Sequence, residues 1–157
     1  MLKKIISGGQ TGADRAALDF AIAHGIPHGG WCPLGRLAED GILDAKYHLV
    51  ETPFPDYAQR TEWNVRDSDG TIIFTVGKEL LGGSLITAEF AALHGKPWLH
   101  VSKLRDGAQA AGKLRRFIES NAIRALNIAG PRRSNEPTVD KFVNRTLERW
   151  WAATRKR

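Results

Sequence analysis

The residues best placed to do chemistry lie near the start of the chain, where Ile5 to Arg15 read IISGGQTGADR. An apolar run ends in Gly8 and Gly9, and helix-type sequence begins within a few residues. This layout puts unpaired backbone N–H groups at the positive end of a helix, where phosphates and other anions bind. We therefore predict an anion-binding loop, with contacts from Gly8, Gly9, Gln10, Thr11, Gly12, Asp14 and Arg15.

The loop differs from the two best-known phosphate-binding motifs. A P-loop needs Lys followed by Ser or Thr after its last glycine, whereas Gly12 is followed by Ala13 and Asp14. A dinucleotide fingerprint G-x-G-x-x-G would start at Ser7 instead of a glycine, and the acidic residue expected after the second strand is missing. The sequence therefore disfavours a NAD-dependent dehydrogenase. A glycine turn that merely connects a strand to a helix is the simpler alternative, but it needs none of these polar residues.

Charged residues further along the chain form a second set of candidates. Arg36 shares a loop with Glu39 and Asp40, and its guanidinium can hold a phosphate through two parallel hydrogen bonds. Arg60 and Asn64 are four residues apart and share one face of a predicted helix. Surface ion pairs explain such helix residues equally well, so both interpretations of Arg60 and Asn64 stay open.

Aromatic, cysteine and histidine residues give weaker evidence of a functional site. Trp31 offers a face on which a heteroaromatic ring could stack, although a tryptophan is more often simply buried. Cys32 lacks the companion residues of a cysteine nucleophile, which favours inert packing. The five histidines are scattered without the spacing of a zinc site, so we predict no protein-bound metal.

Length and composition describe an ordinary globular chain. Its 157 residues suffice for one domain with a two-layer or three-layer core, and we predict a single domain over residues 1–157. A single cysteine excludes an internal disulfide and fits a reducing compartment. No leader or long apolar segment is visible, so we expect a cytoplasmic protein without a membrane partner. The net charge of +6 suits anionic partners.

Strand-type and helix-type segments alternate, which predicts a parallel sheet covered by helices on both faces. Three glycine-rich loops (8–12, 77–84 and 130–134) follow strands and should share the carboxyl edge of the sheet. If strand 3–7 neighbours strand 71–76, the first two loops face one crevice. We expect residues 31–40 to be a loop outside the core. The predicted strands are 3–7, 26–29, 47–51, 71–76, 98–101 and 124–129, and the predicted helices are 12–24, 56–67, 85–94, 107–121 and 137–153.

Several of these segments together resemble the putative molybdenum carrier family. The resemblance spans about residues 3–135 and is carried by GGQTGADR (8–15), GWCP (30–33), GR (35–36), AEDG (38–41), RTE (60–62), NV (64–65), DSDGT (67–71) and GS (83–84) with Thr87. This family is a circularly permuted branch of the Rossmann-like superfamily that also holds lysine-decarboxylase-like, cytokinin-activating phosphoribohydrolases. The resemblance implies a Rossmann-like three-layer α/β sandwich with a doubly wound, mostly parallel sheet. It also implies homo-oligomers and a nucleotide-like or molybdopterin-type phosphorylated ligand.

The hydrolase branch carries a Gly-Gly-x-Gly-Thr-x-x-Glu loop, and residues 82–89 read GGSLITAE. The two glycines and Glu89 are kept, but Leu85 replaces the later glycine and Thr87 lies one place late. We expect Gly83, Ser84 and Thr87 to contact phosphate, with Glu89 as the candidate catalytic acid.

Three functions follow in order of preference. The first is binding of a phosphorylated ring compound, a nucleotide or the molybdenum cofactor as cargo. The second is a nucleoside-phosphate hydrolase in which Glu89, Asp14, Glu39 or Asp40 activates water. The third is a nucleic-acid-binding module, which is least favoured because no helix-turn-helix, RRM or KH pattern is present.

Overall fold

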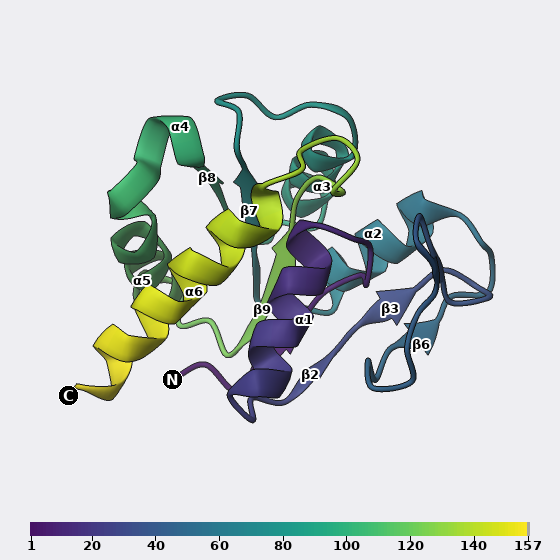
Figure 1. Ribbon diagram of the computed structural model, residues 1–157, viewed down its shortest axis with the longest axis horizontal. Coiled ribbons are helices and arrows are strands. Elements are labelled where there is room, and N and C mark those ends of the chain that lie inside the picture. Colours follow the sequence, from purple (N-terminus) through teal and green to yellow (C-terminus); the bar gives the residue numbers. More distant parts are fainter. Residues whose placement is uncertain (157) are drawn as a thin grey trace.

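A five-stranded parallel sheet forms the centre of the structure, a computed structural model that describes residues 1–156 (Figure 1). The order of the strands across the sheet is β2-β1-β9-β7-β8. The five strands are β1 (Lys4–Ile6), β2 (His28–Gly29), β7 (Gly70–Thr75), β8 (Trp98–Ser102) and β9 (Ala125–Ala129).

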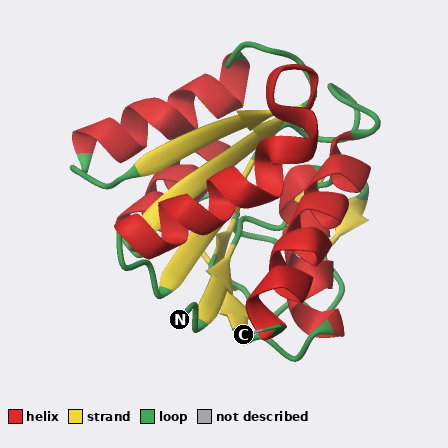
Figure 2. Ribbon diagram, turned by 90° about the vertical axis from the view of Figure 1, so that its left-hand side faces the viewer, coloured by secondary structure: helices red, strands yellow, loops and turns green. Residues whose placement is uncertain are grey.

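Helices cover both faces of this sheet, as Figure 2 shows. On one face α6 packs against α1 and α5, and on the other α2 packs against α3. The three-layer α/β architecture and the parallel sheet predicted from the sequence are confirmed. The helices are α1 (Ala13–Ala23), α2 (Tyr57–Arg66), α3 (Gly82–Leu93), α4 (Lys103–Asp106), α5 (Ala110–Ser120) and α6 (Val139–Arg155), with a 3₁₀ turn at Gly107–Gln109.

Local sequence explains the central elements. All six residues of β7 are buried, as expected for an apolar, β-branched run inside a parallel sheet. Phe74 of β7 meets Phe142 of α6 edge to face, with ring centroids 5.6 Å apart. The predicted cap of α2 is confirmed, because the side chain of Asp56 accepts a hydrogen bond from the Ala58 amide.

The position of β9 differs from the simplest expectation. The arrangement in which β1 neighbours β7, considered from the sequence, is wrong, because the last strand of the chain lies between them. Counted from β9, the sheet order becomes 3-2-1-4-5, the order of doubly wound dinucleotide-binding folds. The chain therefore changes direction across the sheet between β9 and β7. Ligands of such folds bind beyond the carboxyl ends of the strands at this switch point.

Residues 30–56 form a small extension beside α1 and α2. Cys32 and Ala38 are buried there against Leu18 of α1, so the expectation that residues 31–40 contribute nothing to a core is wrong. The predicted strand 47–51 shortens to two residues and pairs with β3 rather than with the central sheet. The short strands of the extension are β3 (Trp31–Cys32), β4 (Leu37–Ala38), β5 (Gly41–Ile42) and β6 (Val50–Glu51).

None of the helices within residues 1–156 combines the length and apolar character needed to cross a membrane.

Candidate functional site

A cavity of about 790 Å³ lies beyond the carboxyl ends of β1, β9 and β7, at the switch point of the sheet. Its walls come from the loops that follow these strands and from α2 and the first turns of α3. This volume falls in the range of pockets for small molecules and cofactors. The residues expected to bind phosphate that line the cavity are Gly8, Gln10, Asp14, Arg60, Asn64, Gly83, Ser84 and Thr87.

The wall of the cavity is unusually rich in buried polar side chains. Gln10, Asp14, Arg60, Ser84 and Asn127 are each less than a tenth exposed. Burying a polar group costs free energy unless it finds a hydrogen-bond partner. Polar groups that line this cavity without a partner therefore mark positions where a ligand would be stabilised.

Gln10 carries such a group. Its Oε1 accepts hydrogen bonds from the amides of Thr11, at 3.0 Å, and Glu39, at 2.9 Å. These two donors identify Oε1 as the acceptor atom and leave Nε2 as the donor. The Nε2 group is buried and has no hydrogen-bond partner among the described residues. Gln10 therefore carries a buried N–H donor without a partner, and the residue lines the cavity.

Arg60 reaches the site from α2. Its Nη1 donates to the carbonyl oxygen of Gly8 at 2.7 Å and lies 3.7 Å from Oδ2 of Asp14. Burial raises the pKa of the Asp14 carboxyl above its ordinary value, and the nearby Arg60 charge opposes part of that rise. A Cβ on Gly8 would stand 2.5 Å from the Arg60 side chain, so this glycine makes room for the guanidinium.

The amino end of α3 faces the same cavity. The helix was expected to begin near Leu85 but begins at Gly82, so both glycines lie in its first turn. The helix has no side-chain cap, and the amides of Gly82 and Gly83 make no hydrogen bond to the described residues. Thr87 does not face a ligand with its hydroxyl, which donates to the Gly83 carbonyl at 2.8 Å. The free amides and the helix dipole favour an anion at this end.

The loop after β7 is held by an internal carboxylate. Oε2 of Glu136 accepts hydrogen bonds from the amides of Val76 and Gly77, each at 2.8 Å. Thr75 donates to the Gly77 carbonyl at 2.6 Å, so the Nε2–H of His100, 2.7 Å away, acts as the donor to Thr75 Oγ1. Glu136 therefore takes up amides that would otherwise be open to an anionic ligand.

The amino end of α1 is also closed by the protein itself. The amide of Gln10 donates to Asp14 Oδ2 at 3.3 Å, and the amide of Ala13 donates to the Pro131 carbonyl at 3.3 Å. Gly12 adopts a φ of +80°, and a Cβ there would lie 2.5 Å from that carbonyl. The anion seat predicted here is therefore filled by protein groups, because the loop after β9 packs directly over it. Gly9, Thr11 and Gly12 do not line the cavity.

The charged residues next to this turn join loops together. Arg15 holds Asp40 through two hydrogen bonds of 2.9 and 3.0 Å and lowers the pKa of that carboxyl. Glu39 accepts from Thr11 Oγ1 and from Ser134 Oγ, and these hydrogen bonds lower its pKa. Neither Arg15, Glu39 nor Asp40 lines the cavity.

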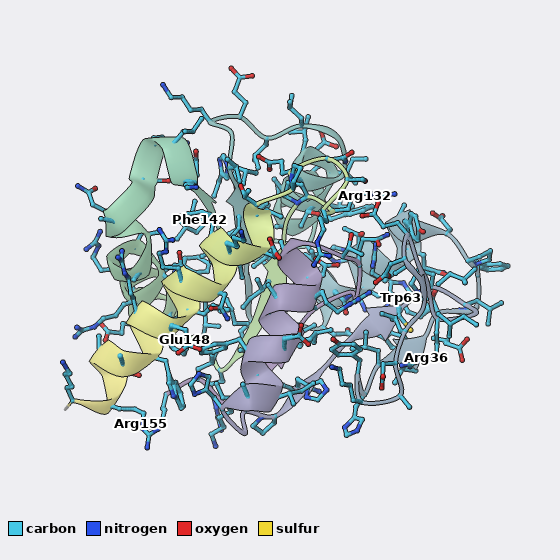
Figure 3. All side chains as sticks on the ribbon, in the orientation of Figure 1. Arg36, Trp63, Arg132, Phe142, Glu148 and Arg155 are labelled. Carbon is cyan, nitrogen blue, oxygen red and sulfur yellow. The ribbon has the colours of Figure 1, made fainter. Side chains whose placement is uncertain are left out.

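The side chains of Arg36 and Trp31 likewise make contacts within the protein and do not line the cavity. The Arg36 guanidinium donates to the carbonyls of Asp44, Tyr47 and Leu49. Trp31 meets Trp63 edge to face and donates through Nε1 to Asp67, outside the cavity. Figure 3 shows Arg36 and Trp63 well apart from Arg132 at the cavity.

Asn64 lines the cavity, but its side chain is hydrogen-bonded to the backbone of Trp31. Its Oδ1 accepts from the Trp31 amide at 2.7 Å, and its Nδ2 donates to the Trp31 carbonyl at 3.0 Å. Asn64 therefore clips the extension to α2. Glu89, the candidate catalytic acid, is exposed on α3 and does not line the cavity.

Sequence reasoning missed several cavity residues. Tyr57 begins α2 directly after the Asp56 cap, and nothing in its local sequence marks it as functional. Arg132 lies in the third glycine-rich loop (130–134), which was expected at this edge of the sheet because it follows a strand. The cavity residues missed are Tyr57, Thr75, Lys78, Glu79, Asn127, Asn135 and Glu136.

No group of three or more His, Cys, Asp or Glu side chains suited to a metal ion occurs within residues 1–156.

Comparisons with known proteins agree with this architecture. Residues 5–151 match the model of the circularly permutated YpsA SLOG family. The chain is similar to a solved structure named as a putative molybdenum carrier protein from Syntrophus aciditrophicus SB, with 51% sequence identity and a TM-score of 0.93. That similarity covers 95% of this chain and 94% of the other. No curated protein matches the sequence.

Proposed function

The chain belongs to the circularly permutated YpsA SLOG family, and on that basis we propose that its cavity binds a phosphorylated, ring-bearing small molecule. The resemblance to the molybdenum carrier family seen in the sequence is confirmed. The name of the 51%-identical relative makes the molybdenum cofactor the first candidate for the cargo, with a nucleotide as the second.

The observation that carries this proposal is the unpartnered Nε2 of Gln10. A buried amide donor that finds no acceptor costs about 1–3 kcal/mol, and a phosphate oxygen in the cavity would remove that cost. The Oε1 atom of the same side chain is held by two backbone donors, so the amide cannot rotate to use Nε2 elsewhere without losing them.

The phosphate position that fits best lies at the amino end of α3. Gly82 and Gly83 would donate their free amides, and Ser84 would donate its hydroxyl. Arg60 and Arg132 both line the cavity and supply positive charge beside Tyr57. Leu81, Ile86 and Pro131 also line the cavity and would supply apolar contacts for a ring.

Binding is favoured over hydrolysis by the positions of the candidate acids. Among Asp14, Glu39, Asp40 and Glu89, Asp14 alone lines the cavity. The Asp14 carboxylate accepts a hydrogen bond from the Gln10 amide and lies beside the Arg60 guanidinium. Because both contacts engage this carboxylate, it is poorly placed to act as the base that activates water. We therefore expect no release of free base when AMP is incubated with the protein.

Calorimetric titration tests the proposal with AMP, ribose 5-phosphate and a phosphorylated pterin as probes. The informative variant is Gln10→Glu, which keeps an oxygen at the Oε1 position and replaces the free N–H donor with a carboxylate oxygen. Both backbone hydrogen bonds to the side chain can persist, while a phosphate in the cavity now meets a negative charge. We expect at least a tenfold loss of affinity, equivalent to about 1.4 kcal/mol.

Gln109→Glu is the matched control, because it makes the same chemical change at an exposed position outside the cavity. Its affinity should stay within twofold of the wild-type value. Absence of binding by all three probes, or equal affinity for the wild type and Gln10→Glu, would contradict the proposal. Homo-oligomer formation and a cytoplasmic location remain predictions, and sedimentation velocity would test the first of them.

A further inference from the structure

Tyr57 lies in the cavity wall with two positive charges on its ring. The guanidinium carbons of Arg60 and Arg132 are each 5.3 Å from the centroid of the Tyr57 ring. Tyr57 is 37% exposed and lines the cavity together with both arginines. Among the described residues that line the cavity, Tyr57 is the only aromatic one.

The two arginines are held very differently. Arg60 is buried and tied to the Gly8 carbonyl, so its position is fixed by the fold. The side chain of Arg132 makes no hydrogen bond or ion pair with the described residues, and its contact with Tyr57 is a cation–π contact alone. Figure 3 shows Arg132 on the loop that leads into α6, above the amino end of α1. Arg132 can therefore leave the ring without breaking any other polar contact.

The planar guanidinium of Arg132 and a heteroaromatic ring of a ligand can both stack on the ring of Tyr57, so they compete for it. Stacking of a base on an aromatic side chain is stronger than a partly exposed cation–π contact. A displaced guanidinium then needs an anion, and a phosphate joined to the ring supplies one within the same cavity. The exchange is favourable when both parts of the ligand arrive together.

Resting on the proposed function, we propose that Tyr57 is the platform for the aromatic ring of the ligand and that Arg132 occupies this platform until the ring displaces it. The displaced Arg132 then pairs with the anionic group of the same ligand. The site consequently selects aromatic rings that carry a phosphate over either part alone. Tyr57 and Arg132 determine this specificity, and the displaced Arg132 holds the phosphate together with Gln10 and the amino end of α3.

The test uses AMP, adenosine and ribose 5-phosphate, which separate the ring from the phosphate. Tyr57→Leu should weaken AMP binding about tenfold and leave ribose 5-phosphate within twofold. Tyr57→Phe keeps the ring and should restore AMP binding, which a merely structural loss at this position would not predict.

Arg132→Gln gives the sharper result, because its two effects have opposite signs. The variant should bind AMP less tightly, since a charge on the phosphate is lost, and adenosine more tightly, since the platform is vacant. Arg133→Gln is the matched control from the same loop, because Arg133 pairs with Asp140 and does not line this cavity. It should change neither affinity by more than twofold.

The outcomes separate this inference from the proposed function. Wild-type protein that binds neither AMP nor ribose 5-phosphate contradicts the phosphate site itself. If wild-type protein binds ribose 5-phosphate as tightly as AMP, the result supports the phosphate site and contradicts the proposed stacking of the ring on Tyr57. An Arg132→Gln variant that loses adenosine and AMP in parallel also overturns it. Unchanged thermal unfolding of each variant shows that the comparison is between folded proteins.

Discussion

Arg60 Nη1 lies 2.7 Å from the carbonyl oxygen of Gly8, so a helix of the outer layer directly holds the turn that follows the first strand. The same guanidinium lies near the buried carboxyl of Asp14 and over the ring of Tyr57. One side chain of α2 thereby contacts the turn after β1, the first turn of α1 and the ring of Tyr57, and all three line the cavity.

Removing the Arg60 charge should destabilise the fold through Asp14. In Arg60→Leu a buried carboxylate loses its partner, and we expect a loss of about 3 kcal/mol or more at pH 7 in urea unfolding. Burial already raises the pKa of Asp14, so its protonation relieves the loss as the pH falls. The difference between variant and wild type should therefore shrink from pH 7 toward pH 4.

The double variant Arg60→Leu with Asp14→Asn is the corresponding control. It should regain part of the lost stability at pH 7 and show little pH dependence of the remaining difference. Equal destabilisation of the single and double variants at every pH would show that Asp14 is not the cause.

Close packing of the β9–α6 loop over α1 predicts a large effect at Gly12. Gly12→Ala should cost about 2–4 kcal/mol, because the new Cβ meets the Pro131 carbonyl and φ is +80°. Gly25, at the other end of α1, has a φ of +63° with open space around its Cβ position, so Gly25→Ala should cost about 1 kcal/mol. Thermal unfolding of both variants measures the difference, and equal costs would exclude a packing role for Gly12.

His100 should make stability fall on acidification. Burial, with a smaller contribution from Arg105, lowers its pKa below 6.5, so the unfolded chain binds a proton that the folded chain resists. Stability supplied by the neutral His100 is present above pH 6.5 and is lost as the pH falls through the lower folded value. His100→Gln keeps a donor for Thr75 and should flatten the dependence of unfolding free energy between pH 7 and pH 5.

A residual slope should remain in that variant, because the pKa of His28 is also lowered by burial and by His48. His28→Gln should remove the His28 contribution to the pH dependence of the unfolding free energy, and its slope can be compared with that of His100→Gln. An unaltered slope in His100→Gln would show that His100 titrates alike in the folded and unfolded chains.

Trp31 should matter for stability and not for ligand affinity. Its indole N–H donates to Asp67 at 2.8 Å, and its ring packs on Trp63 with centroids 4.8 Å apart. Trp31→Phe should therefore cost about 1 kcal/mol in unfolding experiments while AMP affinity stays within twofold. A tenfold loss of AMP affinity would return Trp31 to the role of a stacking residue that its sequence position first suggested.

Local patterns were sufficient for the central strands and the main helices, but not for the short strands of the extension, and only for part of the site. The apolar run of β7, the Asp56 cap and the glycines that end helices act within a few residues, so they can be read directly. Gln10 and Ser84 were found because they follow strands in glycine-rich loops. The contacts of Trp31 and Arg36 could not be predicted, because the Trp31 indole donates to Asp67 and the Arg36 guanidinium donates to backbone carbonyls, and neither kind of partner has a sequence signature.

The sequence by itself determined the alternation of strands and helices, the parallel sheet and the edge at which its glycine-rich loops gather. Hydrophobic periodicity and turn chemistry are local properties, and a parallel sheet of alternating elements leaves one edge for the loops. Only the tertiary structure decided that β9 enters the centre of the sheet, that Pro131 and Asp14 close the end of α1, and that Arg132 lies over the ring of Tyr57. Those choices depend on which backbone and side-chain groups come within contact distance after packing, and residues as distant in the sequence as Ala13 and Pro131 decide them together.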